Sequence, residues 1–123
     1  MKEAVIVSTA RTPIGKAYRG SFNNTPSPTL GGHAVRAAVE RAGIDPALVD
    51  DCIMGSAMPQ GTQGLNVARN IARRAGLPVT VSGMTIDRQC SSGLMAVATA
   101  AKQIMYDGMD VVVGGGVESI SLV

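Results

Sequence analysis

Aromatic residues are almost absent from this sequence: its 123 residues include two tyrosines, one phenylalanine and no tryptophan. The core must therefore be built from alanine, valine, isoleucine, leucine and methionine. Charge is also scarce, because charged residues make up 16% of the chain and the formal net charge is only +2. So small a net charge predicts neither a nucleic-acid partner nor an anionic membrane partner.

Cysteine and histidine are equally rare, with two cysteines and the single histidine His33. Two cysteines, one in an expected strand and one at an expected helix start, do not make a disulfide framework. They indicate a reducing, intracellular compartment, and we expect a cytoplasmic protein without a metal site. No apolar run is long enough to span a bilayer, and no signal peptide precedes the first expected strand, so we expect no membrane partner.

Strand and helix patterns alternate along the chain. Runs rich in β-branched residues predict strands, and apolar residues at helical spacing predict helices. The expected strands span residues 3–10, 51–57, 79–87 and 110–113, and the expected helices span residues 29–42, 65–75 and 94–106. This alternation predicts an α/β fold in which helices cover a mainly parallel sheet.

Cys90 lies where the expected strand 79–87 leads into the helix 94–106. The first N–H groups of a helix lack internal partners and carry partial positive charge, which favours a thiolate and can hold an oxyanion. The next residues, Ser91-Ser92-Gly93, are small and leave room for a substrate near the sulfur. These features predict a catalytic nucleophile. The alternative is a small buried hydrophobe, the common role of a free cysteine and the one expected for Cys52.

Four segments of the chain carry motifs that occur together in one enzyme family. They are an opening strand and turn at 4–15, a polar block at 60–69, the Cys90 segment at 87–96, and the glycine-rich 113–121. In this order they resemble the thiolases, and the sequence Asp-Arg-Gln-Cys-Ser-Ser-Gly-Leu-Met-Ala at 87–96 is similar to the thiolase nucleophile motif. The resemblance covers almost the whole chain.

This resemblance implies a three-layer α/β/α sandwich whose amino-terminal domain is incomplete in this sequence. Residues 1–123 correspond to the amino-terminal part of that domain, with strands 1 to 4 and the nucleophile helix. In thiolases a fifth strand lies between strands 4 and 1, and it follows later in the sequence. The second cysteine, the histidine and the asparagine of the thiolase site also follow later. His33 is not in the family's Gly-His-Pro motif, so we interpret it as a surface or packing residue.

The implied activity is reversible thiolytic cleavage of a 3-ketoacyl-CoA through an acyl-cysteine at Cys90. Coenzyme A is then a co-substrate, no cofactor is bound permanently, and the full-length protein is a homodimer or tetramer that pairs near residues 79–87. Ser91-Ser92-Gly93 is more similar to degradative thiolases of fatty acid metabolism than to biosynthetic acetoacetyl-CoA thiolases, which remain an alternative. A condensing enzyme of the ketoacyl-synthase type and a non-catalytic fragment or assembly partner are two further alternatives.

Overall fold

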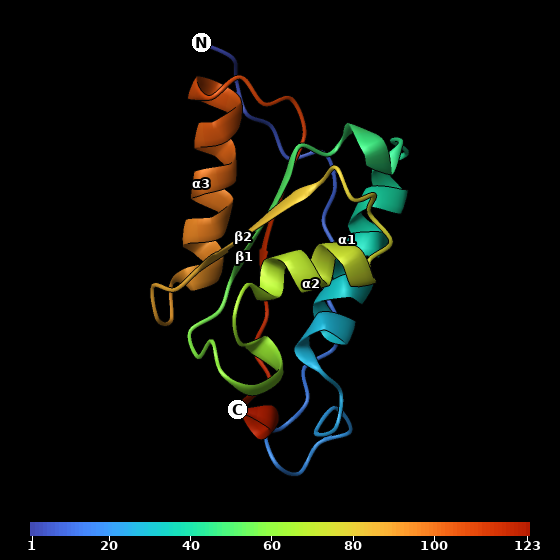
Figure 1. The fold of residues 1–123 in the computed structure, drawn as a ribbon, viewed down its shortest axis with the longest axis vertical. Helices are drawn as coiled ribbons and strands as arrows, with labels where there is room; N and C mark the ends of the chain where they lie inside the picture. Colours follow the sequence, from blue (N-terminus) through green and yellow to red (C-terminus); the bar gives the residue numbers. More distant parts are fainter.

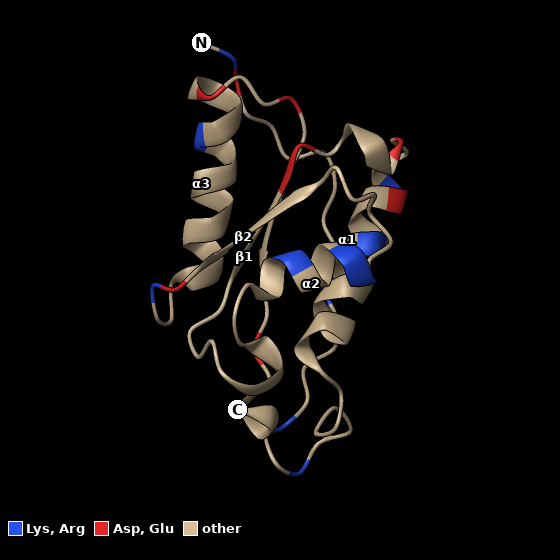
Figure 2. Cartoon of the chain, viewed as in Figure 1, with Lys and Arg blue, Asp and Glu red and all other residues tan.

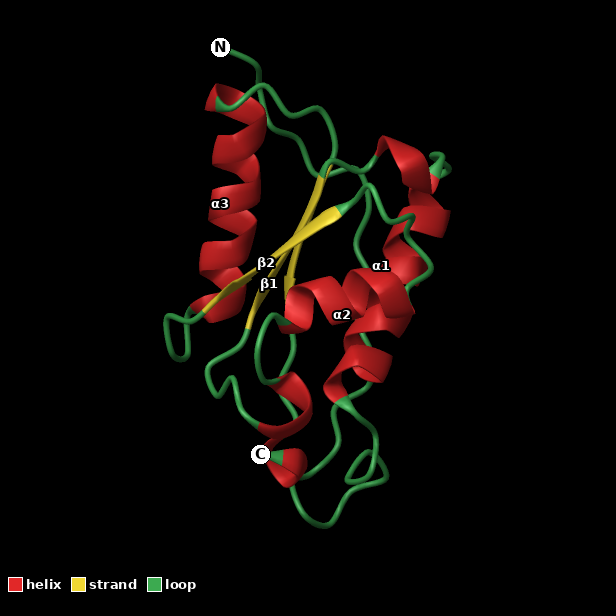
Figure 3. Ribbon diagram, in the orientation of Figure 1, coloured by secondary structure: helices red, strands yellow, loops and turns green.

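The structure, a computed structural model, describes all 123 residues (Figure 1). Three helices and three strands form it: α1 (Ser27–Ala42), β1 (Asp51–Gly55), α2 (Val67–Arg74), β2 (Ser82–Ile86), α3 (Ser92–Tyr106) and β3 (Val112–Gly116). Three single 3₁₀ turns lie between or after them, at Pro46–Leu48, Gly61–Gln63 and Ile120–Leu122. Figure 3 shows that long loops occupy both ends of the sheet.

The sheet has the order β2-β1-β3, and both pairings are parallel. β1 lies in the centre, where every one of its residues is buried. Ile53 of β1 aligns with Met84 of β2 and with Gly114 of β3. The predicted parallel sheet is therefore confirmed, and β2 lies at its edge.

Helices cover both faces of this sheet, which makes three layers (Figure 1). Successive side chains of a strand point to opposite faces. Cys52 and Met54 of β1 accordingly pack in a large apolar cluster with residues of α1 and α2, whereas Ile53 packs with Ala96 and Ala100 of α3. The predicted α/β/α sandwich is confirmed.

α3 is the only helix on its face of the sheet. It packs through small side chains, and a Cβ added at Gly114 of β3 would lie 3.0 Å from Cα of Val97. Figure 2 shows that α3 carries little charge along its length. Its outer side is nevertheless open to solvent, and Leu94 is 75% exposed. The sequence predicts a helix buried on several sides, but in this chain only the sheet covers it.

Most helix and strand ends agree with the sequence pattern to within a few residues. α1 ends at Gly43, which has the left-handed φ of 67° that favours glycine. It begins at Ser27, two residues before the expected start at Thr29, with Pro28 in its first turn. The fourth expected strand, 110–113, is shifted: β3 runs from Val112 to Gly116 and so includes the three glycines that follow the expected strand.

The prediction of a first strand at 3–10 is wrong for this structure, because these residues form neither strand nor helix. They run beside β3 without a strand ladder. An apolar groove of about 510 Å³ separates them from β3, and α1 and α3 line its sides. The apolar residues Val5, Ile6 and Val7 are 69%, 76% and 75% exposed. A strand needs a neighbour about 4.8 Å away to receive its hydrogen bonds, and none lies within reach here.

Candidate functional site

Cys90 lies in the tight loop between β2 and α3, immediately before the residue that caps α3, Ser91. Its neighbour Gln89 has φ of 49°, a left-handed conformation that non-glycine residues seldom adopt. Ser92 holds this turn in place: its buried hydroxyl donates to the carbonyl of Gln89 at 2.6 Å and accepts from the N–H of Arg88 at 2.8 Å. The position of Cys90 is therefore fixed by hydrogen bonds within the loop itself.

The start of α3 rests directly on the end of β1. A Cβ added at Gly55 would lie 2.2 Å from the carbonyl carbon of Ser92 and 2.5 Å from the nitrogen of Gly93, so only glycine fits there. On the other side, a Cβ at Gly116 would lie 3.2 Å from Cα of Gly93. The carboxyl ends of β1 and β3 thus form a floor beneath the residues that follow Cys90. In open parallel sheets this edge commonly binds ligands.

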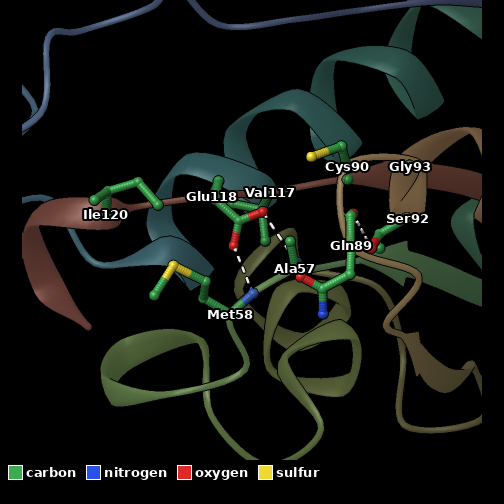
Figure 4. Close-up of a pocket in the computed structure, with 11 residues that line it drawn as sticks. Ala57, Met58, Gln89, Cys90, Ser92, Gly93, Val117, Glu118 and Ile120 are labelled. Carbon is green, nitrogen blue, oxygen red and sulfur yellow. Dashed lines mark hydrogen bonds between the residues drawn. The ribbon is translucent and has the colours of Figure 1, made fainter.

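An open pocket of about 580 Å³ lies over this floor (Figure 4). Its lining comes from three segments: the end of β1 and the loop after it, the loop before α3 with the first residues of α3, and the end of β3 with the residues after it. These residues are Gly55, Ala57 and Met58; Gln89, Cys90, Ser92 and Gly93; and Gly116, Val117, Glu118 and Ile120. Cys90 is exposed, so its sulfur is open to a ligand. The N–H of Gly93, one of the lining residues, donates to no backbone or side-chain oxygen and is therefore an unpaired donor near Cys90.

Glu118 connects two walls of this pocket. Its carboxylate accepts the N–H groups of Ala57 at 3.0 Å and Met58 at 3.1 Å, as the dashed lines in Figure 4 show. Its Oε1 also accepts the side-chain amide of Gln63 at 2.6 Å. The block 60–69 and the glycine-rich block 113–121, which the sequence presents as separate motifs, therefore meet at the site.

The two cysteines have different environments. Cys52 is fully buried in β1, where burial, together with the nearby Asp51, raises the pKa of its thiol to about 12. It therefore remains a thiol near neutral pH and acts as a packing residue, as the sequence predicts. Cys90 is the one cysteine that a reagent can reach.

His33, the only histidine, is exposed on α1 and is not among the residues that line the pocket. It is a surface residue, as the sequence analysis proposes. The structure contains no cluster of three or more histidine, cysteine, aspartate or glutamate residues that could hold a metal ion. None of its helices combines the length and the apolar character needed to cross a membrane.

Comparison with known proteins shows which family this arrangement belongs to. A family model described as "Thiolase, N-terminal domain" matches residues 4–123. The chain belongs to the thiolase family. The resemblance inferred from its motifs is confirmed.

Relatives that are named either 3-ketoacyl-CoA thiolase or acetyl-CoA acetyltransferase support the thiolase assignment. The 3-ketoacyl-CoA thiolase of Bacillus subtilis (strain 168) is 50% identical over 123 residues, which are 100% of this chain and 32% of that protein. The acetyl-CoA acetyltransferase of Cupriavidus necator is 47% identical over 121 residues, 98% of this chain and 30% of that protein. The crystal structure of the Bacillus anthracis acetyl-CoA acetyltransferase superposes with a TM-score of 0.92 at 43% identity, covering 99% of this chain and 30% of that one. The chain thus spans about a third of the length of these thiolases.

The sequence predicts Cys90 as the nucleophile from its position and its small neighbours, but it does not predict the residues that hold the Cys90 loop. Ser92 was interpreted only as a small residue, whereas its hydroxyl fixes the Cys90 loop. Gln63 and Glu118 were noted only as parts of family blocks. The only signal in the sequence is that Gln63 is a polar residue within the block 60–69, and its partner Glu118 lies 55 positions away.

Proposed function

We propose that these residues supply the nucleophile of an acyl-CoA:acetyl-CoA C-acyltransferase, a thiolase, with Cys90 as the residue that carries the acyl group. The observation that supports this most is the placement of Cys90: exposed, at the start of α3, in a pocket with a free Gly93 N–H. Small neighbours and a nearby donor suit attack of the sulfur on a carbonyl carbon.

The proposed reaction has two halves. The Cys90 thiolate attacks the 3-keto carbon of a 3-ketoacyl-CoA, the bond between carbons 2 and 3 breaks, and its electron pair leaves on acetyl-CoA as an enolate that takes up a proton. A thiolate of coenzyme A then attacks the acyl-cysteine and regenerates the Cys90 thiolate. Coenzyme A enters as a co-substrate, and no permanently bound cofactor takes part. Covalent catalysis of this kind replaces one difficult step by two easier ones.

Proton transfer in this scheme depends on groups outside residues 1–123. Besides Cys90 and Glu118, no titratable side chain lines the pocket. The relatives are about three times as long, so the later sequence has room for the acid–base groups. By resemblance to thiolases, these are a histidine and a second cysteine, with an asparagine beside them.

Later sequence also completes the sheet in our proposal. A strand inserted between residues 3–10 and β3 would fill the apolar groove, cover Val5, Ile6 and Val7, and give residues 3–10 the neighbour that they lack. The hydroxyl of Ser8, which lines this groove, is buried without a hydrogen-bond partner. A strand backbone at this place would supply one. Residues 1–123 are then the amino-terminal part of the amino-terminal domain.

The direction and the assembly follow from the motif and from the open sheet edge. Ser91-Ser92-Gly93 favours a degradative 3-ketoacyl-CoA thiolase over a biosynthetic acetoacetyl-CoA thiolase. β2 has no strand partner on its outer side, where the carbonyl of Gly83 accepts the side-chain amide of Asn66 at 2.8 Å. This edge suits pairing with β2 of a second subunit in a homodimer.

The test is acyl-enzyme trapping in the complete protein of which these residues are a part. Incubation with acetoacetyl-CoA, acid quench and peptide mass measurement should place an acetyl group on Cys90. Cys90→Ala should abolish both the acetylated peptide and turnover, whereas the matched variant Cys52→Ala should keep the acetyl group on Cys90. Acetylation at another residue, or turnover in Cys90→Ala, would refute the assignment. A correctly folded complete protein that neither acetylates nor turns over would favour a non-catalytic assembly role.

A further inference from the structure

Glu118 makes an unusual set of contacts for an exposed carboxylate. Its two oxygens accept four hydrogen bonds, from the hydroxyl of Ser56 at 3.2 Å, the N–H groups of Ala57 and Met58 at 3.0 and 3.1 Å, and the amide of Gln63 at 2.6 Å. No lysine or arginine pairs with it, because the only ion pair of the chain joins Lys2 and Asp110. All four neighbours donate, so both oxygens act purely as acceptors.

Two of these donors have no other partner. The loop after β1 leaves the ladder at Ser56, whose N–H still donates to the carbonyl of Ile86 in β2 at 3.0 Å. From there on, the N–H groups of Ala57 and Met58 donate only to Glu118. The conformation of this wall of the Cys90 pocket therefore depends on a side chain that comes from the opposite wall.

The side-chain amide of Gln63 orients Glu118. It is fully buried, and both ends of its amide are satisfied. The nitrogen donates to the carbonyl of Met58 at 2.7 Å and to Glu118, and the oxygen accepts the hydroxyl of Ser27 at 2.8 Å and the N–H of Ser119 at 2.7 Å. A buried amide with all of these partners holds one orientation. The network thus joins the start of α1, the loop after β1 and the segment after β3.

We propose that Glu118 is a positioning residue for the Cys90 site, oriented by Gln63, and that it holds Ala57 and Met58 as the wall against which the acyl part of the substrate lies. The proposal rests on the thiolase function proposed above. Glu118 acts on the shape of the pocket and carries no proton in the reaction. Its removal therefore impairs acyl transfer to Cys90 and leaves the reactivity of the thiol towards a small reagent unchanged.

Glu118→Gln tests this in the complete protein. The substitution keeps the size of the side chain but puts an NH₂ group, a donor, among four donors, so at least one contact is lost. We expect kcat/KM with acetoacetyl-CoA and CoA to fall by about tenfold to hundredfold, the cost of a small misplacement in an active site. The rate of Cys90 alkylation by iodoacetamide should stay at the wild-type value. Glu118→Asp, which keeps both acceptors on a shorter stem, should fall between wild type and Glu118→Gln.

The matched control is Glu40→Gln on α1, because Glu40 is exposed and its side chain makes no hydrogen bond or ion pair. It should behave as wild type. A folded Glu118→Gln with wild-type kcat/KM would overturn the proposal. So would a Glu118→Gln variant in which alkylation of Cys90 slows by the same factor as turnover. If Glu118→Gln does not fold, Glu118→Asp decides by the same two readouts. A displaced pH–rate profile in Glu118→Asp would identify Glu118 as a proton carrier, and this result would also overturn the proposal. Inactive wild-type protein would refute the proposed function instead.

Discussion

Selective thiol labelling measures the difference between the two cysteines. Burial raises the pKa of Cys52 to about 12, so at pH 8 about one part in ten thousand of this thiol is ionised. An ordinary free thiol of pKa about 8.5 is ionised to about a quarter at that pH. Because only the thiolate reacts, Cys52 should be alkylated at least ~10³-fold more slowly than an exposed free thiol, before its complete burial is considered.

The assay is a time course with iodoacetamide at pH 8 on the folded complete protein, read as modified peptides by mass spectrometry. Cys90 should be modified throughout, while Cys52 stays unmodified until urea unfolds the protein. In urea both cysteines should react at similar rates, which controls for differences between the peptides. Modification of Cys52 at a rate near that of Cys90 in the folded protein would refute the reasoning.

The same pKa shift predicts lower stability at high pH. The folded state keeps the proton of Cys52 up to about pH 12, whereas the unfolded chain loses it above about pH 9. Stability contributed by the neutral thiol is therefore full below pH 9 and declines as pH rises towards 12, by up to about 4 kcal/mol at about 1.4 kcal/mol per unit. Urea unfolding of Cys52→Ala should lack this component of the pH dependence. Parallel curves for the two proteins would contradict it.

Three further outcomes are expected. Gly55→Ala should lower the free energy of unfolding by about 1–3 kcal/mol, because the added Cβ overlaps Ser92. Gly93→Ala is the control and should not lower it, because its Cβ meets only Cα of Gly116 at 3.8 Å. Equal urea midpoints for the two variants would contradict this prediction. Residues 1–123 alone should aggregate and be inactive, because the groove beside β3 and the outer side of α3 stay uncovered; a sharp thermal transition from a soluble monomer would exclude this. The complete protein should be dimeric by light scattering at micromolar concentration; a monomer with β2 open to solvent would argue against pairing at this edge.

Local signals in the sequence were sufficient for most of the fold. The end of α1 at Gly43 and the turn at Asp45–Pro46, whose aspartate accepts the N–H of Ala47 at 2.9 Å, depend on backbone chemistry within a few residues. The order of strand, Cys90 loop and helix follows in the same way from periodicity and small residues. Predictions of this kind succeed because the interactions that decide them are close in sequence.

The errors arise where distant parts of the chain decide the outcome. Residues 3–10 have the composition of a strand, yet strand formation requires a partner that this chain does not place beside them. Glycine runs favour turns, but glycines 114–116 belong to β3 and pair with β1, and the close approach of α3 and β1 leaves no room for side chains there. Glu118 and Gln63 become a network only after the fold brings positions 55 apart into contact.

The first residues of the chain have a further consequence for how the protein is made. Two side-chain contacts hold them: Arg41 of α1 donates to the carbonyl of Thr9 at 2.9 Å, and Lys2 pairs with Asp110, 108 positions downstream. At a synthesis rate of about 5–20 residues per second, the apolar segment 5–7 is therefore made ~5–20 s before Asp110, the later of these two partners. During this interval the segment is an exposed hydrophobic stretch that chaperones and proteases can recognise. One contact of the part that is made first thus forms only after most of the chain has been made.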